Sequence, residues 1–283
     1  YDDNIYFNAT FHSGIVIPFE CNISYMFMRL KIFNQTLPNL STTAGRTSYQ
    51  GILAYCSAYS LPLPASWIAP TTVQNIVSYY FLFNDCVLFD QDLGSTFVGS
   101  AANNMTNMFS GATSYTNGGS NSIESWDTSN VGEFSGALRA TAINYNLFGV
   151  GKWSLVNATN LEDMCSNMPN FNNGGVNIER NFGSTNRGIS MNGMFGNCPS
   201  LTNVAFGGTT TLPSGIATVI TMMATYTGCN NVGFTGSNIP ANFINNRVID
   251  LGGTFDSASN FIGNTNMLSW DVSGVTKYSS NFI

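Results

Sequence analysis

Apolar residues return along this chain at a nearly constant interval. The clearest copy lies in residues 104–115, where Met108 and Phe109 are followed by a small residue and then an aromatic one. We take the residue at the place of Phe109 as the anchor of each repeat. Gaps of 26 to 31 residues separate the anchors, which are Phe27, Leu53, Phe83, Phe109, Leu138, Cys165, Phe195, Tyr226 and Phe255. A period held this closely over most of a chain indicates a repeat array.

Two further positions keep their character in the repeats. The third residue after the anchor is small or apolar: Leu30, Cys56, Cys86, Ala112, Met168, Cys198, Cys229 and Ala258. The sixth is mostly aromatic: Phe33, Tyr59, Phe89, Tyr115, Phe171, Leu201, Val232 and Phe261. Such spacing puts side chains on one face of a short helical turn. We therefore predict a core ladder of Phe27, Phe83, Phe109, Phe195, Tyr226 and Phe255 at the anchor, with Phe89, Tyr115, Phe171 and Phe261 beside them.

A second apolar group follows each anchor segment after a polar, glycine-rich turn of variable length. Its copies are residues 63–67, 93–97, 178–182, 212–216 and 239–243, with shorter versions at 123–126 and 268–270. Proline, tryptophan and β-branched neighbours favour extended segments there. Each repeat is thus predicted to hold a helical turn, a loop, a short strand and a turn. The fold class predicted is a leucine-rich-repeat-like solenoid of mixed short strands and helical turns, with about nine rungs of 26 to 31 residues.

The repeated pattern MFxxAxxF followed by IxxWDxSNVxxM resembles the repeats of BspA-like bacterial surface proteins. The resemblance is best at residues 105–131, 190–201 and 248–275, and it extends more weakly over residues 23–283. Related modules occur in surface lipoproteins of wall-less and Gram-positive bacteria and in virion proteins of some viruses. The resemblance implies a surface-exposed solenoid that is used for contact, with no catalytic residues to transfer.

Residues 1–22 fit the repeat poorly and are assigned as an N-terminal cap, which an open array needs. Residues 23–283 form the array, which ends within a repeat; its most degenerate copy is at 132–153. Because the last residues are apolar and nearly uncharged, the final repeat is predicted to pack on another protein. Tyr278, Phe282 and Ile283 are the residues expected in that contact. The alternative is a frayed tail.

Composition narrows the classes of function. Charged residues make up only 8% of the chain, against roughly 25% in an ordinary soluble domain. A polar but uncharged surface of this kind is typical of adhesins and virion fibres. The net charge is −6 and the nine basic residues are scattered, which argues against nucleic-acid binding. The longest apolar run, residues 76–83, is far short of the ~20 residues that span a bilayer.

The six cysteines do not have the spacing of a zinc site, because no CxxC pair exists. Cys56, Cys86, Cys198 and Cys229 share one register with Leu, Ala and Met, which predicts buried free thiols. The alternative is a disulfide between neighbouring repeats, Cys56 to Cys86 or Cys198 to Cys229. It requires Cα atoms within about 7 Å.

Catalytic patterns are weak. His12 is the only histidine and has no visible nucleophile beside it. Residues 149–152 lack the earlier glycine and the following Ser or Thr of a phosphate-binding loop. Asp85, Asp90 and Asp92 offer oxygens for Ca²⁺, but a solvated turn is the preferred interpretation.

A pair of carboxylates for glycoside cleavage is also open, since Glu124 and Asp127 in one repeat have a counterpart in Asp271 of another. These acids flank a tryptophan, and capping of the following turn is the preferred interpretation. No cofactor and no metal are expected.

The function predicted is a non-enzymatic structural or recognition module on a virion surface, on the exterior of a bacteriophage tail or capsid. The alternative is an adhesin on a bacterial cell surface, and a third hypothesis is a solenoid glycan hydrolase. The partners expected are other virion or envelope proteins, further copies of the chain, or a host-surface glycan or protein. Neither nucleic acid nor a membrane span is expected.

Overall fold

The computed structural model describes residues 6–12, 14–18, 21–41, 47–176, 188–202, 220–229, 247–259 and 265–278. The chain divides into two compact units. Unit 1 comprises Tyr1–Val131 with Ala137–Ile143, and unit 2 comprises Gly132–Gly136 with Asn144–Ile283. The change from one unit to the other falls within residues 132–153, the segment in which the sequence repeat is most degenerate.

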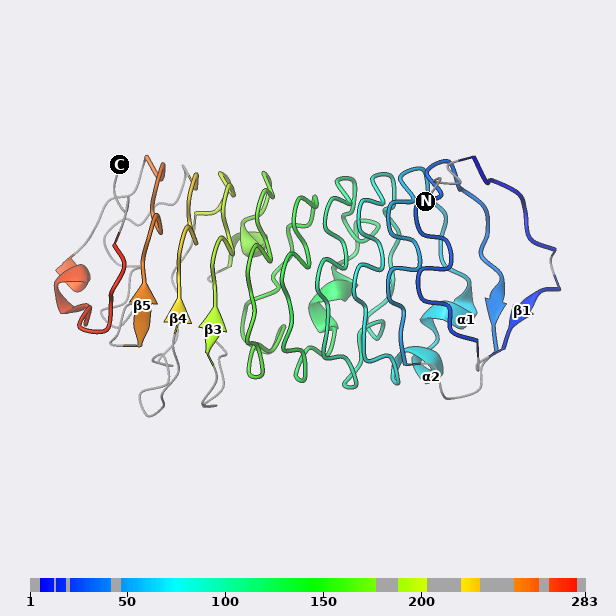
Figure 1. Cartoon of the computed structure of the whole chain (residues 1–283), viewed down its shortest axis with the longest axis horizontal. Helices are drawn as coiled ribbons and strands as arrows, with labels where there is room; N and C mark the ends of the chain where they lie inside the picture. Colours follow the sequence, from blue (N-terminus) through cyan, green and yellow to red (C-terminus); the bar gives the residue numbers. More distant parts are fainter. Residues whose placement is uncertain are drawn as a thin grey trace. The chain divides into compact units, whose positions relative to one another are not determined.

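Regular elements are short, and all the strand pairing described is parallel. Unit 1 holds β1 (Val16–Ile17) paired with β2 (Asn39–Leu40), together with the helices α1 (Ala65–Ile68) and α2 (Pro70–Val73). In unit 2, β3 (Ile189–Ser190), β4 (Ile220–Thr221) and β5 (Val248–Asp250) lie side by side in one sheet (Figure 1). The 3-10 helices are η1 (Asn121–Ser125), η2 (Asn173–Gly175) and η3 (Thr265–Ser269).

Isolated parallel bridges continue the same pairing between repeats. They join Ser48 to Ser78 and Ser78 to Asn104 in unit 1, and Glu133 to Asn160, Asn160 to Ser190 and Asp250 to Lys277 in unit 2. All these residues except Lys277 lie five positions before an anchor. The extended part of each repeat therefore precedes the anchor.

In the anchor segment the backbone amides divide into two sets. In the repeat of Phe83, alternate amides donate to carbonyls of the next repeat: those of Tyr79, Phe81, Phe83 and Asp85 to Asn104, Thr106, Met108 and Ser110. The intervening amides close turns within the repeat, as Cys86 does onto Phe83 and Phe89 onto Cys86. Consecutive three-residue turns place the anchor and the third and sixth residues after it on one side of the chain.

The helical turn predicted for the anchor segment is wrong. Residues two before and two after each anchor have positive φ, for example 59° at Phe81 and 54° at Asp85. A left-handed residue every fourth position interrupts a right-handed helix, because helical hydrogen bonding needs negative φ at consecutive residues. The period of three seen in the sequence comes instead from successive turns. Glycine takes several of these left-handed positions, and Asn or Asp takes others.

The extended segments predicted after the anchor are also wrong where the structure describes them. Residues 63–67 overlap α1, residues 123–126 overlap η1, residues 268–270 overlap η3, and residues 93–97 form a turn. The other copies, 178–182, 212–216 and 239–243, lie outside the described residues. The short helices let an indole reach the preceding repeat. Nε1 of Trp67 donates to the Pro38 carbonyl (2.8 Å), and Nε1 of Trp126 donates to the Gly94 carbonyl (2.8 Å).

Aromatic rings form the core of each unit. In unit 1, Phe33, Tyr59, Phe89 and Tyr115 stack in sequence, with centroids 5.8 to 6.1 Å apart. In unit 2, Phe171, Phe195, Tyr226 and Phe255 stack in the same way, at 5.8 to 6.1 Å. The predicted ladder residues are buried, apart from Phe261, which lies outside the described residues. Phe195 and Phe255 are separated by the ring of Tyr226.

The cysteines of the repeat register occupy small buried positions and bond to the repeat before them. Sγ of Cys56 and of Cys86 donates to the carbonyls of Phe27 and Leu53, each at 2.8 Å. Cys198 and Cys229 donate to the carbonyls of Cys165 (2.9 Å) and Phe195 (3.0 Å). The thiols thus add side-chain links to the backbone ladder.

Candidate interaction surface

The bridged face of the repeats carries polar side chains five residues before each anchor and, in several repeats, also three residues before it. We call these side chains the polar row. The fifth residue before the anchor is polar in each repeat: Asn22, Ser48, Ser78, Asn104, Glu133, Asn160, Ser190, Thr221 and Asp250. Apart from Asn22, which is exposed, and Asp250, which is buried, these residues are half-buried.

This polar position has a structural cause that the sequence reasoning missed. Oδ1 of Asn104 accepts the amide of Thr106 (2.9 Å), and Oδ1 of Asn160 accepts the amide of Glu162 (3.1 Å). The same bond runs from the amide of Gln50 to Oγ of Ser48 (3.2 Å). A short polar side chain that accepts the amide two residues on forms an Asx or Ser/Thr turn. The invariant polar residue five before the anchor was the signal that could have revealed it.

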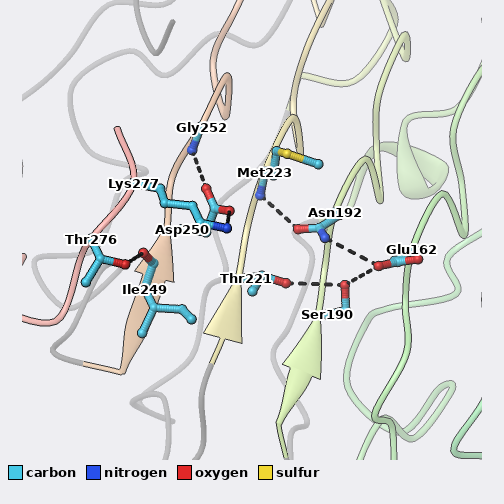
Figure 2. Close-up of polar contacts among 10 residues, drawn as sticks. All are labelled: Glu162, Ser190, Asn192, Thr221, Met223, Ile249, Asp250, Gly252, Thr276 and Lys277. Carbon is cyan, nitrogen blue, oxygen red and sulfur yellow. Dashed lines mark hydrogen bonds and ion pairs between the residues drawn. The ribbon is translucent and has the colours of Figure 1, made fainter. Parts of the chain in front are cut away.

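In unit 2 the polar row is linked from repeat to repeat. Oε1 of Glu162 accepts hydrogen bonds from Oγ of Ser190 (2.8 Å) and Nδ2 of Asn192 (3.3 Å). Oγ1 of Thr221 donates to Oγ of Ser190 (3.3 Å). Figure 2 shows these groups on adjacent parallel segments, and it shows the amide of Met223 bonded to Oδ1 of Asn192 (3.0 Å). The row is therefore a pre-ordered line of hydroxyl and amide groups.

Asp250 and Lys277 lie at the last described bridge of the row. Oδ1 of Asp250 accepts the Gly252 amide (2.9 Å), and Oδ2 lies 3.4 Å from Nζ of Lys277 (Figure 2). The carboxylate side chain is only 9% exposed and the lysine side chain is 70% exposed. Of the predicted docking residues, Tyr278 is 52% exposed and its hydroxyl donates to the Val272 carbonyl (3.4 Å). Phe282 and Ile283 lie outside the described residues.

Two of the three acidic residues considered for Ca²⁺, Asp90 and Asp92, have structural partners. Oδ1 of Asp90 accepts the amides of Thr116 (2.7 Å) and Gly118 (2.8 Å) in the next repeat. Asp92 accepts the amide of Gly94 and the hydroxyl of Ser122. Burial is the largest influence on the pKa of Asp92 and raises it, but several hydrogen bonds outweigh it and the pKa is lowered. These turns are thus joined to a neighbouring repeat rather than simply solvated.

The other catalytic candidates also serve turns. Nδ1 of His12 accepts the amide of Gly14 (3.2 Å). Asp127 accepts the amide of Ser129 (3.1 Å) and Asp271 accepts the amide of Ser273 (3.0 Å), which confirms the predicted capping role for two of the three carboxylates, whereas Glu124 lies inside η1. The amide of Lys152 closes a turn onto the Gly149 carbonyl (3.1 Å). Within the described ranges, no group of three or more His, Cys, Asp or Glu side chains is placed to hold a metal ion.

None of the helices in the described part of the chain is long and apolar enough to cross a membrane.

Comparison with protein families shows what class of chain this is. One family model matches residues 20–121, 65–136, 81–207 and 217–283. Overlapping matches to one model, offset along the chain, show that this is a repeat protein. The matches cover more than half of the chain, so the protein belongs to the family described as Mycoplasma protein of unknown function, DUF285. Comparisons with curated proteins and with solved structures give no match.

Proposed function

We propose that this chain is a non-enzymatic recognition module, displayed on an exposed surface as a solenoid of BspA-like repeats. The observation that carries the proposal is the polar row. Its hydroxyl, amide and carboxylate groups are held at fixed places by turns and bridges, at the ~4.8 Å spacing of adjacent strands. A rigid, pre-ordered line of donors and acceptors loses little conformational entropy when it binds a partner.

Several observations support a contact role over catalysis. Asp127 and Asp271, two of the acids considered for glycoside cleavage, accept hydrogen bonds that hold turns together. His12 does the same. A catalytic group needs a proton-transfer partner within reach of a substrate, whereas the hydrogen bonds described for these groups run to turns of the chain itself.

The chain has two candidate locations, a bacterial cell surface and a virion surface. The family description names Mycoplasma, which supports a bacterial cell surface. The low content of charged residues supports the virion surface expected from the sequence. Antibodies against this chain, applied to intact cells and to purified virions, distinguish the two. Signal on neither, with signal only after cells are opened, contradicts surface display.

Recognition is tested with fluorescently labelled protein on intact bacterial cells and on intact animal cells, measured by flow cytometry, because a bacteriophage protein would bind the former and a bacterial adhesin the latter. Saturable binding that unlabelled protein competes away is the expected result. Glu162→Lys reverses a charge in the linked part of the polar row in unit 2 and removes the acceptor of Ser190 and Asn192. We expect it to weaken binding, whereas Asp256→Lys makes the same charge change in unit 2 outside the row and serves as the control. Equal binding by both variants contradicts a role for the row.

A further inference from the structure

A polar depression of about 420 Å³ opens on unit 1. Its walls come from four successive repeats, those anchored at Leu53, Phe83, Phe109 and Leu138. The residues that matter for its chemistry are Tyr55, Phe81, Asn84, Asp85, Gly111 and Arg139.

The depression exists because side-chain size falls along one register. The second residues after successive anchors are Tyr55, Asp85, Gly111 and Ala140. All four have positive φ, 64°, 54°, 77° and 57° respectively, so they lie in equivalent backbone positions. Gly111 leaves the floor open, and a Cβ built there would collide with Oδ1 of Asp85. The carboxylate of Asp85 therefore extends over the glycine of the next repeat.

The lining brings together an acidic side chain, a basic side chain and an amide. Burial raises the pKa of Asp85, while the charge of Arg139 lowers it by less. Arg139 itself is exposed. A lining amide belongs to Asn84, which is only 5% exposed. Its Nδ2 donates to the Ser110 carbonyl (2.8 Å), and its Oδ1 has no partner among the described residues.

Two aromatic rings complete the lining. Tyr55 and Phe81 are half-buried, so part of each ring faces outward. The guanidinium of Arg29 lies 5.8 Å from the centroid of the Tyr55 ring, a cation–π distance that helps to fix the ring. Aromatic faces beside polar groups suit a ligand that has both C–H surface and hydroxyls.

We propose that this depression binds a neutral saccharide unit, a refinement that rests on the proposed recognition function. Hydroxyl groups donate to the Asp85 carboxylate and accept from the Arg139 guanidinium, and the C–H face of the sugar lies on the aromatic rings. An anionic ligand is disfavoured by the carboxylate, and a cationic one by the guanidinium. The volume falls within the range of about 300–1,000 Å³ found for small-molecule sites.

The test uses the whole chain on a printed array of neutral, sialylated and sulfated glycans, followed by titration calorimetry with the neutral glycan that gives the strongest signal. Asp85→Ala and Arg139→Gln are each expected to weaken that binding by about tenfold or more, since each removes a hydrogen bond to a charged group. Asn197→Ala changes the equivalent left-handed position of another repeat and is the control that should retain binding. Circular dichroism verifies folding of each variant. Because Arg139 is exposed, Arg139→Gln is expected to fold and still tests the site if Asp85→Ala does not fold.

Three results overturn the inference: no neutral glycan binds, the sialylated or sulfated glycans alone bind, or the Asp85 and Arg139 variants bind like the original. The cell-binding measurement tests the recognition function independently of these glycan measurements. Saturable cell binding that survives Asp85→Ala leaves the recognition function standing and removes only the saccharide site. Absence of saturable binding of the unmodified protein to both bacterial and animal cells contradicts the recognition function itself.

Discussion

Sγ of Cys86 donates a hydrogen bond to the carbonyl oxygen of Leu53, the anchor of the preceding repeat, across 2.8 Å. Both residues are fully buried. The thiol thus fills a small core position and satisfies a backbone acceptor of its neighbour. The repeated bond at Cys56, Cys198 and Cys229 makes this a rule of the register.

The buried thiols should be unreactive in the folded protein. Burial raises the pKa of Cys56 to about 12 and that of Cys86 well above its ordinary value, and the thiolate is the reactive form. With iodoacetamide at neutral pH, we expect Cys86 and Cys198 to stay unmodified until the chain is denatured. Exposed Cys21 is the internal positive control. Tm should be the same with and without reductant, and a large fall on reduction would reveal disulfides instead.

Truncation of a ladder ring should be costly. Phe195 lies between Phe171 and Tyr226 at centroid distances of 6.1 and 5.8 Å and is fully buried. Phe195→Ala is expected to lower the free energy of unfolding by about 3–5 kcal/mol. Leu268→Ala, at an 88% exposed side chain, should change it by less than ~0.5 kcal/mol. Urea unfolding followed by circular dichroism measures both. Equal small losses would mean that the ring is not part of a packed column.

Substitution of a left-handed glycine should be most destabilising where a side chain of the neighbouring repeat lies close to it. Gly193 has φ of 63°, and a Cβ there would meet Oδ1 of Asp163 at 2.5 Å. Gly175 has φ of 76°, and a Cβ built on it would meet no other atom within 4 Å. Gly175→Ala should therefore cost only backbone strain, about 1–2 kcal/mol, whereas Gly193→Ala should cost more. Comparison of the two unfolding free energies isolates the contact with Asp163. The interpretation fails if Gly175→Ala is the more damaging change.

Two substitutions of Asp250 separate the effect of its ion pair with Lys277 from that of its hydrogen bond with the Gly252 amide. Asp250→Asn keeps an acceptor for the Gly252 amide and loses the ion pair with Lys277. Because that lysine is exposed, the loss should be at most about 1 kcal/mol. Asp250→Ala also leaves the amide without its partner, which should cost about 1–3 kcal/mol. A Lys277→Met variant should match Asp250→Asn in thermal unfolding. If the asparagine and alanine variants were equally unstable, the turn bond would have no role.

Asp85 and Asp271 should respond to pH in opposite directions. The folded-state pKa of Asp85 is raised by burial above 3.8, so its contribution to stability is present below 3.8 and is lost as the pH rises through the folded value. Asp85→Asn should therefore be at least as stable as the original at pH 7, with that advantage gone at pH 3.

Hydrogen bonds from Ser273 lower the pKa of Asp271, so its contribution is present above 3.8 and is lost as the pH falls through the folded value. Asp271→Asn should accordingly be less stable at pH 7, with the gap closing in acid. Urea midpoints at the two pH values test both variants. The same sign of change for both would contradict the assigned environments.

Much of the core was determined by the sequence alone. Phe83, Cys86 and Phe89 occupy buried positions in one repeat, and their spacing of three was visible without coordinates. Burial of apolar side chains is a property of residue type and register, and both recur along the chain. The capping by Asp127 and Asp271 was equally predictable, because an Asx turn involves only residues two apart.

Only the tertiary structure decided the backbone that joins these positions. Phe81 and Asp85 take left-handed φ although neither residue type demands it, because their own amides donate to the carbonyls of Thr106 and Ser110, 25 residues further along the chain. Such non-local bonds override local propensity, so the helical turn was expected in the wrong place. The depression over Gly111 arose in the same way. Asp85 and Arg139 are 54 positions apart in the sequence, and only the parallel pairing of successive repeats brings their side chains to one site.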